Sequence, residues 1–212
     1  MSTLGEMKTS IASELMRDDL EPAIGLEISR AIKFYMPKRF WFNEKRTRVV
    51  FNMVIGQDTY TVADHPDIPN LIRIDSITSN RDGLSLLVKL VNQAQMELWL
   101  NSSSILSNPP AYYSYYEQAL RFYPIPDFAY PVRVASVVRV AEPATDDEAN
   151  NPWMNEAEEL IRSRAKSKIF AHWMEDPASG ATMAQMESEA LVSLQAESSS
   201  RTQVNRLVPE CI

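Results

Sequence analysis

The spacing of apolar residues changes twice along this chain, and that change limits the folds it can adopt. Over residues 1–45, apolar side chains recur every three or four positions, which is the period of an amphipathic helix. Over residues 46–141 they alternate with polar side chains in short runs separated by turn residues, as in β-strands. Over residues 142–200 the helical period returns. The pattern predicts an α+β fold, in which a helical bundle core carries an inserted, antiparallel β-rich sub-domain.

Two helices are expected at the N-terminus of the chain. Thr3 and Glu6 have the spacing of a capping box and introduce a one-sided apolar stripe, so a first helix should run to about Arg17. Asp18 and Asp19 then offer capping oxygens for a second and more apolar helix. These two helices would form the N-terminal part of the core.

The inserted sub-domain should consist of antiparallel strands, because the predicted connections between them are short. A first hairpin is expected to turn at Gly56 and a second at Asp82 and Gly83, where turn-forming residues separate apolar runs. The expected elements are strands at 49–55, 60–62, 72–77, 84–90, 112–116, 120–123 and 132–140, and a short helix at 92–100.

The C-terminal part of the core is expected to hold two further helices. Starting at Trp153, apolar residues recur at every fourth position, which predicts one helix of about 24 residues. Glu158 and Arg162 would form an i,i+4 ion pair on its exposed side. The last helix should dissolve at the serine run 198–200, and residues 201–212, which show no period, would form an extended tail.

Glycine is scarce and widely spaced, which excludes several classes of binding site. The chain has five glycines, and the closest two, Gly5 and Gly25, are twenty residues apart. Dinucleotide-binding loops, P-loops and the nucleophile elbow of hydrolases all need glycines within a few residues of one another. None of these sites can be formed here.

Charge and the reactive side chains exclude further functions. Twenty-eight acidic and 21 basic residues give a net charge of −7, which disfavours bulk binding of nucleic acid. Cys211 is the single cysteine, so no intramolecular disulfide can form. His65 and His172 lack a second ligand at metal-binding spacing, so neither a metal nor another cofactor is expected. No apolar run is long enough to cross a bilayer, and no membrane partner is expected.

A basic and aromatic segment at residues 38–48 permits two interpretations. Bases interleaved with aromatic rings are typical of a nucleic-acid platform, so a nucleic-acid-binding module is one alternative function. In the other interpretation the rings pack at the junction of helix and sheet, while the bases extend into solvent or pair with acids of a neighbouring molecule. The residues of this candidate basic patch are Lys38, Arg39, Lys45, Arg46 and Arg48, and the rings are Phe40, Trp41 and Phe42.

Acidic residues cluster at 146–148 and at 156–159, where a hydrolase could in principle place two carboxylates. Consecutive acids in a loop point in different directions, and negative charges in the first turns of a helix interact favourably with the helix dipole. We therefore expect structural roles for both clusters and no enzymatic activity. A hydrolase that uses Glu158 and Glu159 is a third alternative.

Four segments occur in the order seen in one known family. They are AIKFYMPKRFWFNE at 31–44, PNLIRIDSI at 69–77, PPAYYSYYEQALRFYPIPDFAYPV at 109–132 and NPWMNEAEELIRSRAKSKIF at 151–170. On these segments the chain resembles the head-to-tail adaptor proteins of tailed bacteriophages, also called head completion or connector proteins, especially those of short-tailed phages.

This resemblance implies a structural virion protein, assembled in the host cytoplasm. It implies a twelve-membered homo-oligomeric ring that connects the portal protein to the tail nozzle or other tail proteins and continues the DNA channel. Double-stranded DNA would pass through without specific binding. The C-terminal segment would dock onto the portal, which makes Arg201, Leu207 and Val208 candidate interface residues.

Aromatic residues are concentrated between Tyr112 and Tyr130, where eight of the nineteen in the chain lie. Exposed aromatic rings anchor many protein interfaces, and aromatic rings also pack in hydrophobic cores. Tyr113 and Tyr115 are accordingly further candidate residues for contacts with a partner.

Overall fold

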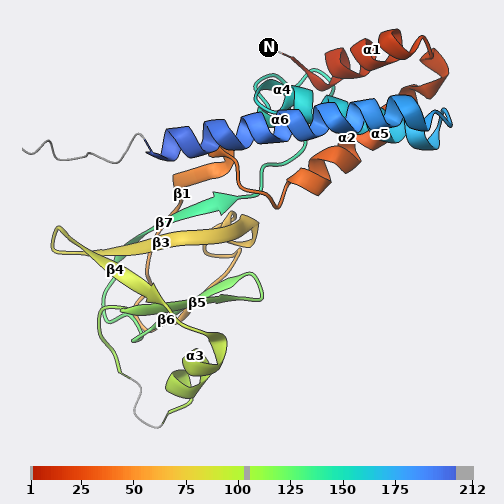
Figure 1. Ribbon diagram of the computed structural model, residues 1–212. Helices are drawn as coiled ribbons and strands as arrows, with labels where there is room; N and C mark the ends of the chain where they lie inside the picture. The colour runs from red at the N-terminus through yellow and green to blue at the C-terminus, as the bar shows by residue number, and fades with distance from the viewer. Residues whose placement is uncertain (1, 103–105, 204–212) are drawn as a thin grey trace, which may run out of the picture. The chain divides into compact units, whose positions relative to one another are not determined.

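The computed structural model describes residues 2–102 and 106–203, which form two compact units (Figure 1). The helical unit contains Met1–Phe42 and Val140–Ile212, and the β unit contains Asn43–Arg139. The predicted α+β class is confirmed. The α-helices are α1 (Leu4–Leu15), α2 (Glu21–Tyr35), α3 (Gln93–Leu100), α4 (Pro152–Asn155), α5 (Glu158–His172) and α6 (Pro177–Gln203).

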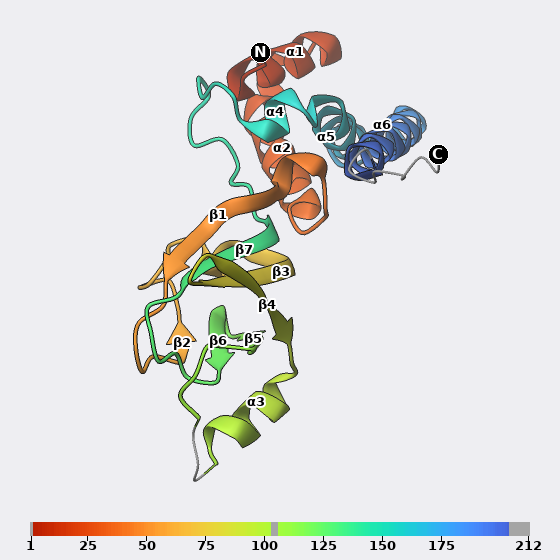
Figure 2. The same cartoon turned by 90° about the vertical axis from the view of Figure 1, so that its left-hand side faces the viewer.

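The β unit is built around a single seven-stranded sheet, whose order is β1-β7-β3-β4-β5-β6-β2 (Figure 2). Short 3₁₀ turns at Asp18–Leu20, Trp41–Asn43 and Ile68–Asn70 connect several elements of the chain. The strands are β1 (Glu44–Asn52), β2 (Thr59–Tyr60), β3 (Leu71–Arg81), β4 (Leu84–Leu90), β5 (Tyr112–Tyr116), β6 (Ala119–Tyr123) and β7 (Pro131–Val138).

The start of α1 follows the predicted capping box. The Thr3 hydroxyl accepts a hydrogen bond from the Glu6 amide, and the Glu6 carboxylate accepts one from the Thr3 amide. The helix ends at Leu15, and Met16 follows in the left-handed region at φ 51°. The predicted cap of α2 is wrong, because Leu20 occupies the N-cap without a capping side chain.

The C-terminal helices differ from the prediction in three places. The expected 24-residue helix is broken between α4 and α5, and Arg162 pairs with Glu14 of α1 rather than with Glu158. The serine run at 198–200 does not end the last helix, because α6 continues to Gln203. Residues 204–212, most of the predicted tail, lie outside the described residues.

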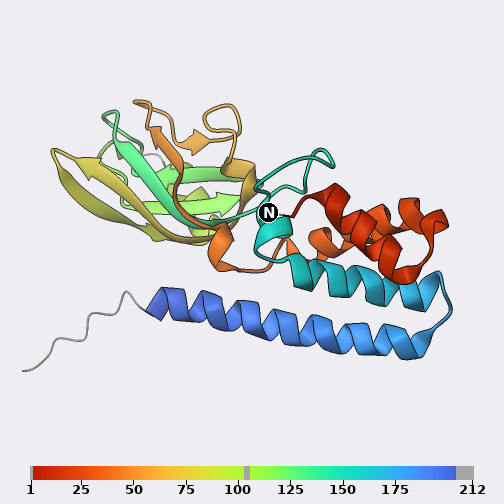
Figure 3. The same cartoon turned by 90° about the horizontal axis from the view of Figure 1, so that it is seen from above.

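The core of the helical unit lies where α1, α2, α4 and α5 meet, and α6 runs alongside α5 (Figure 3). Gly180 allows α5 and α6 to approach closely, because a Cβ atom there would lie 3.3 Å from the Ser167 carbonyl oxygen. The Ser167 hydroxyl donates to the Gly180 carbonyl at 3.0 Å. The largest fully buried side chains of this core are Met7, Ile11, Ile24, Ile28, Ile32, Tyr35, Phe40 and Trp153.

Two predicted hairpins are confirmed in the β unit, β3–β4 and β5–β6. The hairpin predicted at Gly56 is wrong, because β1 pairs with β7 and β2 pairs with β6. The sheet is also not wholly antiparallel, since Lys89 and Leu90 of β4 pair in parallel with Tyr112 and Tyr113 of β5. Helix α3 and the loop after it provide the long crossover that a parallel pair requires.

Candidate functional site

The aromatic residues of segment 38–48 mainly serve the helical core. Phe40 and Phe42 are buried and stack on each other with ring centroids 5.3 Å apart, and both meet the edge or face of Trp153. Trp41 is half-buried. The Phe40 and Phe42 rings therefore cannot stack with nucleic-acid bases while this core is intact.

The bases of the segment belong to two different units. Lys38 and Arg39 lie in the helical unit, whereas Lys45, Arg46 and Arg48 lie on β1 of the β unit. The Lys38 ammonium sits 4.8 Å from the ring centre of Tyr35, and Arg39 is exposed. The two bases of the helical unit and the three bases of the β unit are therefore positioned independently. The structure describes no single surface that combines all five.

The three bases on β1 lie at an edge of the sheet. Arg46, Thr47 and Arg48 bulge out opposite the single residue Ala135 of β7, between two regular stretches of pairing. Arg48 forms an ion pair with Asp67, with 2.8 Å between Nε and Oδ2. Charged side chains and bulges at an edge strand discourage pairing with other strands, so this arrangement also has a structural explanation.

Burial of Asp67 opposes ionisation of its carboxyl group. Hydrogen bonds from Arg48 and Asn70 outweigh that burial, so the pKa of Asp67 lies below its ordinary value. The Arg48–Asp67 pair therefore supports the fold of the β unit at neutral pH. It leaves Lys45 and Arg46 as the exposed bases of β1 without an ion-pair partner among the described residues.

The two candidate tyrosines differ in exposure. Tyr113 is 4% exposed and belongs to the core of the β unit, so little of its ring is available for contact with a partner. Its neighbour Tyr115 is half-buried and donates its hydroxyl to the Ile68 carbonyl at 2.9 Å. Both side chains face the same side of β5, so the difference comes from how the fold covers that side of the sheet at each position.

Near the end of α6, Arg201 covers the ring of Trp41. Its guanidinium carbon lies 3.7 Å from the ring centre, and the guanidinium also pairs with Glu197 one turn earlier. The Trp41 amide donates to the Ser198 hydroxyl at 3.1 Å. Arg201 thus helps to hold α6 against the segment after α2. The other candidates in the C-terminal segment, Leu207 and Val208, lie outside the described residues.

A polar cluster joins α2, α5 and α6. The Tyr35 hydroxyl donates a hydrogen bond to the Glu187 carboxylate. Nη1 of Arg164 donates a second hydrogen bond to the same carboxylate at 2.6 Å. The Arg164 guanidinium lies 3.4 Å from the ring centre of Phe34. Burial and the neighbouring Glu187 carboxylate raise the pKa of the Tyr35 phenol, so this phenol stays protonated and keeps donating.

Beside this cluster lies a groove between α2 and α5 that the sequence analysis missed. We call it the α2–α5 groove; it has a volume of about 260 Å³ and is lined by Glu27, Arg30, Ala31, Arg164, Lys168 and His172. The Glu27 carboxylate is 3% exposed and pairs with Arg30 at 2.6 Å. Lys168 has no ion-pair partner among the described residues. The i,i+4 spacing of Arg164 and Lys168 in the sequence predicts that these two bases share a face of α5. Only the fold shows that Arg30 lies beside them.

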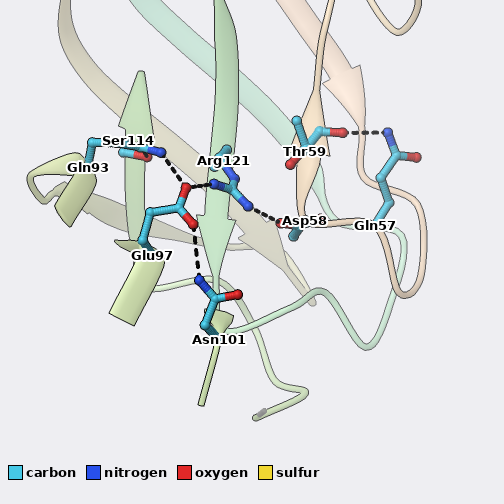
Figure 4. A network of polar contacts seen from close by, with 8 residues as sticks. All are labelled: Gln57, Asp58, Thr59, Gln93, Glu97, Asn101, Ser114 and Arg121. Atoms are coloured by element: carbon cyan, nitrogen blue, oxygen red, sulfur yellow. Dashed lines mark hydrogen bonds and ion pairs between the residues drawn. The ribbon is translucent and has the colours of Figure 1, made fainter. Parts of the chain in front are cut away.

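The β unit holds its own polar network, drawn in Figure 4. Arg121 of β6 forms ion pairs with Glu97 of α3 and, at 3.4 Å, with Asp58 before β2. The Ser114 hydroxyl donates to Gln93 at 3.0 Å, which ties α3 to β5. These contacts fix α3 on the sheet and leave no cluster of reactive groups.

Three acids of the two acidic clusters have polar partners within the helical unit. Asp146 pairs with Lys8 at 2.6 Å, Glu148 accepts hydrogen bonds from Ala144 and Asn151, and Glu159 accepts one from Ser163. No three His, Cys, Asp or Glu side chains within residues 2–102 and 106–203 are placed to hold a metal ion. In the same residues, no helix combines the length and the apolar character needed to cross a membrane.

Comparison with known proteins identifies the family. A family model described as SU10 adaptor protein matches residues 2–208. The chain belongs to this family. No curated protein sequence shows significant similarity to the chain.

The family of SU10 adaptors confirms the resemblance to phage head-tail adaptor proteins. An SU10 adaptor is a structural protein of the virion, and it interacts with other virion proteins such as the portal or the tail. Adaptor families are not typically enzymatic. Contacts with other virion proteins are made through exposed surfaces of the adaptor.

One such surface is strand β4. Leu84, Leu87 and Leu90 are between 62% and 67% exposed; Leu84 and Leu90 lie on one face of the strand and Leu87 on the other. Residues Leu84 to Val88 pair with β3, whereas β5 is paired only at Lys89 and Leu90. Exposed apolar side chains beside an unpaired strand edge are typical of surfaces that contact other proteins.

Proposed function

We propose that this adaptor forms a ring of twelve copies that connects the portal protein to the tail nozzle or other tail proteins and continues the DNA channel. The observation that carries the proposal is the family match over residues 2–208. Copies in a ring contact each other through two different surfaces, and such contacts close by rotation without any chemical step. No catalysis is part of the proposed function.

The C-terminal segment is the proposed contact with the portal. Arg201, at the end of α6, would start this contact, and Leu207 and Val208 would supply its apolar side chains. Tyr115 remains a proposed partner contact through the part of its ring that is exposed. In this proposal the segment after α6 is the part of the helical unit that reaches the axial partner.

Double-stranded DNA would pass through the ring without specific binding. The net charge of −7 of the chain supports this part of the proposal, because net negative charge repels the phosphates of DNA. The alternative function, nucleic-acid binding by residues 38–48, is weakened by the burial of Phe40 and Phe42. Stacking on aromatic rings is what makes such a platform bind bases.

Purified adaptor mixed with purified portal tests the proposed function. Mass photometry should show a complex whose mass equals the portal plus twelve copies of the 24.1 kDa chain. Negative-stain images should show an added ring on the axis of the portal. An adaptor that stays monomeric and never binds the portal would refute the proposal, and tight binding to duplex DNA at physiological salt would favour the alternative.

A further inference from the structure

Two surfaces of the helical unit lie on opposite sides of the α2–α5 pair. On one side, α1 packs through Lys8, which lies against Gly25, and through Glu14, which pairs with Arg162 and Lys166. On the other side lies the α2–α5 groove, lined by Glu27, Arg164 and Lys168 among others.

Helical geometry explains this opposition. Three of the six groove residues stand two positions after a residue on the α1 side, namely Glu27 after Gly25, Arg164 after Arg162 and Lys168 after Lys166. Residues two positions apart in an α-helix are rotated by about 200°. The groove therefore faces away from α1 on both helices at once.

The outward side of α1 has polar acceptors and hydroxyl groups. Its surface, which we call the α1 face, comprises Glu6, Thr9 and Ser13 of one helical stripe, together with Asp147 of the loop before α4. Met16 follows as the C-cap of the helix. Asp147 is exposed and has no ion-pair partner among the described residues. The α1 face thus carries unpaired negative charge, whereas the α2–α5 groove carries the unpaired ammonium group of Lys168.

Met16 follows α1 directly and exposes an apolar side chain. Its side chain is 90% exposed, and its backbone adopts the left-handed conformation at φ 51°. This is a position where glycine is the usual residue, because a side chain there costs free energy. Because most of its side chain is exposed, Met16 buries little apolar surface in the isolated unit, but it can supply an apolar contact to a neighbour.

We propose that the α1 face of one copy docks against the α2–α5 groove of the next copy, with Asp147 and Glu6 beside Lys168 and Arg30, and Met16 packing on the neighbour. The inference rests on the proposed ring and names the surfaces that build it. Because the two surfaces differ and lie on opposite sides of the α2–α5 pair, each copy can bind two neighbours, as a ring requires. The occupant of the groove is thus a second copy of this chain.

Charge reversal on the full-length chain tests this contact. Lys168→Glu and Asp147→Lys should each weaken self-association on the portal by about tenfold, because each places like charges opposite each other. A mixture of the two variants should assemble again, since every contact then pairs opposite charges. Arg133→Glu, which reverses an exposed base of the β unit outside the candidate basic patch, is the matched control and should assemble like the unmodified chain. Mass photometry of each chain with portal gives the readout.

Met16→Gly separates assembly from folding. It should raise the melting temperature of the free chain, because glycine accepts the left-handed conformation, and it should weaken assembly. Equal assembly by all variants, or loss of assembly that mixing does not restore, would overturn the contact while leaving the proposed function intact. Failure of the unmodified chain to assemble on portal would refute the proposed function together with the contact. Loss of duplex DNA binding in Lys168→Glu with normal assembly would assign the groove to DNA and overturn the contact.

Discussion

Glu187 is predicted to hold α6 on the helical unit, and Glu187→Ala tests this. Within the described part of α6, Leu194 is the only buried large apolar side chain, so burial alone holds the helix weakly. The Glu187 carboxylate accepts the Tyr35 hydroxyl and pairs with Arg164 at 2.6 Å. Its side chain is 14% exposed and that of Arg164 is 18% exposed.

The size of the effect follows from these contacts. A hydrogen bond to a charged group contributes about 1.5–3 kcal/mol, and removing one partner of a fully buried ion pair costs about 3–5 kcal/mol. Because this pair is partly hydrated, Glu187→Ala should lower the free energy of unfolding by about 3 kcal/mol. Glu187→Gln, which keeps an acceptor for Tyr35 but loses the charge, should lose about half of that.

Urea denaturation followed by tryptophan fluorescence measures the loss, and hydrogen exchange locates it. Exchange should accelerate in α6 before it does in α2 or α5. Glu189→Ala is the matched control, because Glu189 is an exposed acid on the same helix and should change stability by about 0.5 kcal/mol or less. If Glu187→Ala costs no more than Glu189→Ala, the reasoning about this cluster is wrong.

Three further predictions concern the core and the response to pH. Trp153→Ala should lower the free energy of unfolding by about 3–5 kcal/mol, since Trp153 is fully buried against two phenylalanine rings; a loss below about 1.5 kcal/mol in urea denaturation would contradict this core. The pKa of Asp67 is lowered in the fold, so its contribution to stability is present above an unfolded value of about 4 and is lost as pH falls through the folded pKa. Arg48→Ala should therefore cost about 1 kcal/mol at pH 7 and less in acid, and NMR titration of the Asp67 carboxyl should show its pKa rising; an unchanged pKa would argue against the pair. The raised pKa of Tyr35 means that stability falls as pH rises above about 10, where the unfolded phenol ionises first; Tyr35→Phe should lose this part of the alkaline sensitivity in denaturation curves, and a variant with the full sensitivity would refute the assignment.

Features that depend on neighbouring residues were predictable from the sequence. The capping box of Thr3 and Glu6 closes within one helical turn, and the β3–β4 turn at Asp82 and Gly83 needs only the local backbone. Both appear as predicted because nothing distant competes with them. The burial of Phe40 also follows from its apolar character and the helix that precedes it.

Features that depend on distant pairing were not predictable. Val49 pairs with Val134 across most of the β unit, although the alternating pattern also allowed a local hairpin at Gly56. The fourfold spacing from Trp153 continues through the break between α4 and α5, so the period alone does not reveal it. Tyr113 and Tyr115 lie on the same side of β5 with different burial, because only the fold decides where the sheet is covered.

The α2–α5 groove shows the same limit for the candidate site. Arg30 and Lys168 are far apart in the sequence, and neither belongs to the basic segment at 38–48 that composition favoured. A helical period does predict that Arg164 and Lys168 share a face. It does not predict that α2 brings Arg30 to the same place.

Cryo-electron microscopy of this adaptor bound to purified portal would show how the copies are arranged. We expect a closed ring of twelve copies on the portal axis, with the α1 face of each copy against the α2–α5 groove of the next and an open channel through the centre. Portal particles without an added ring, or single copies bound at scattered positions, would contradict this expectation.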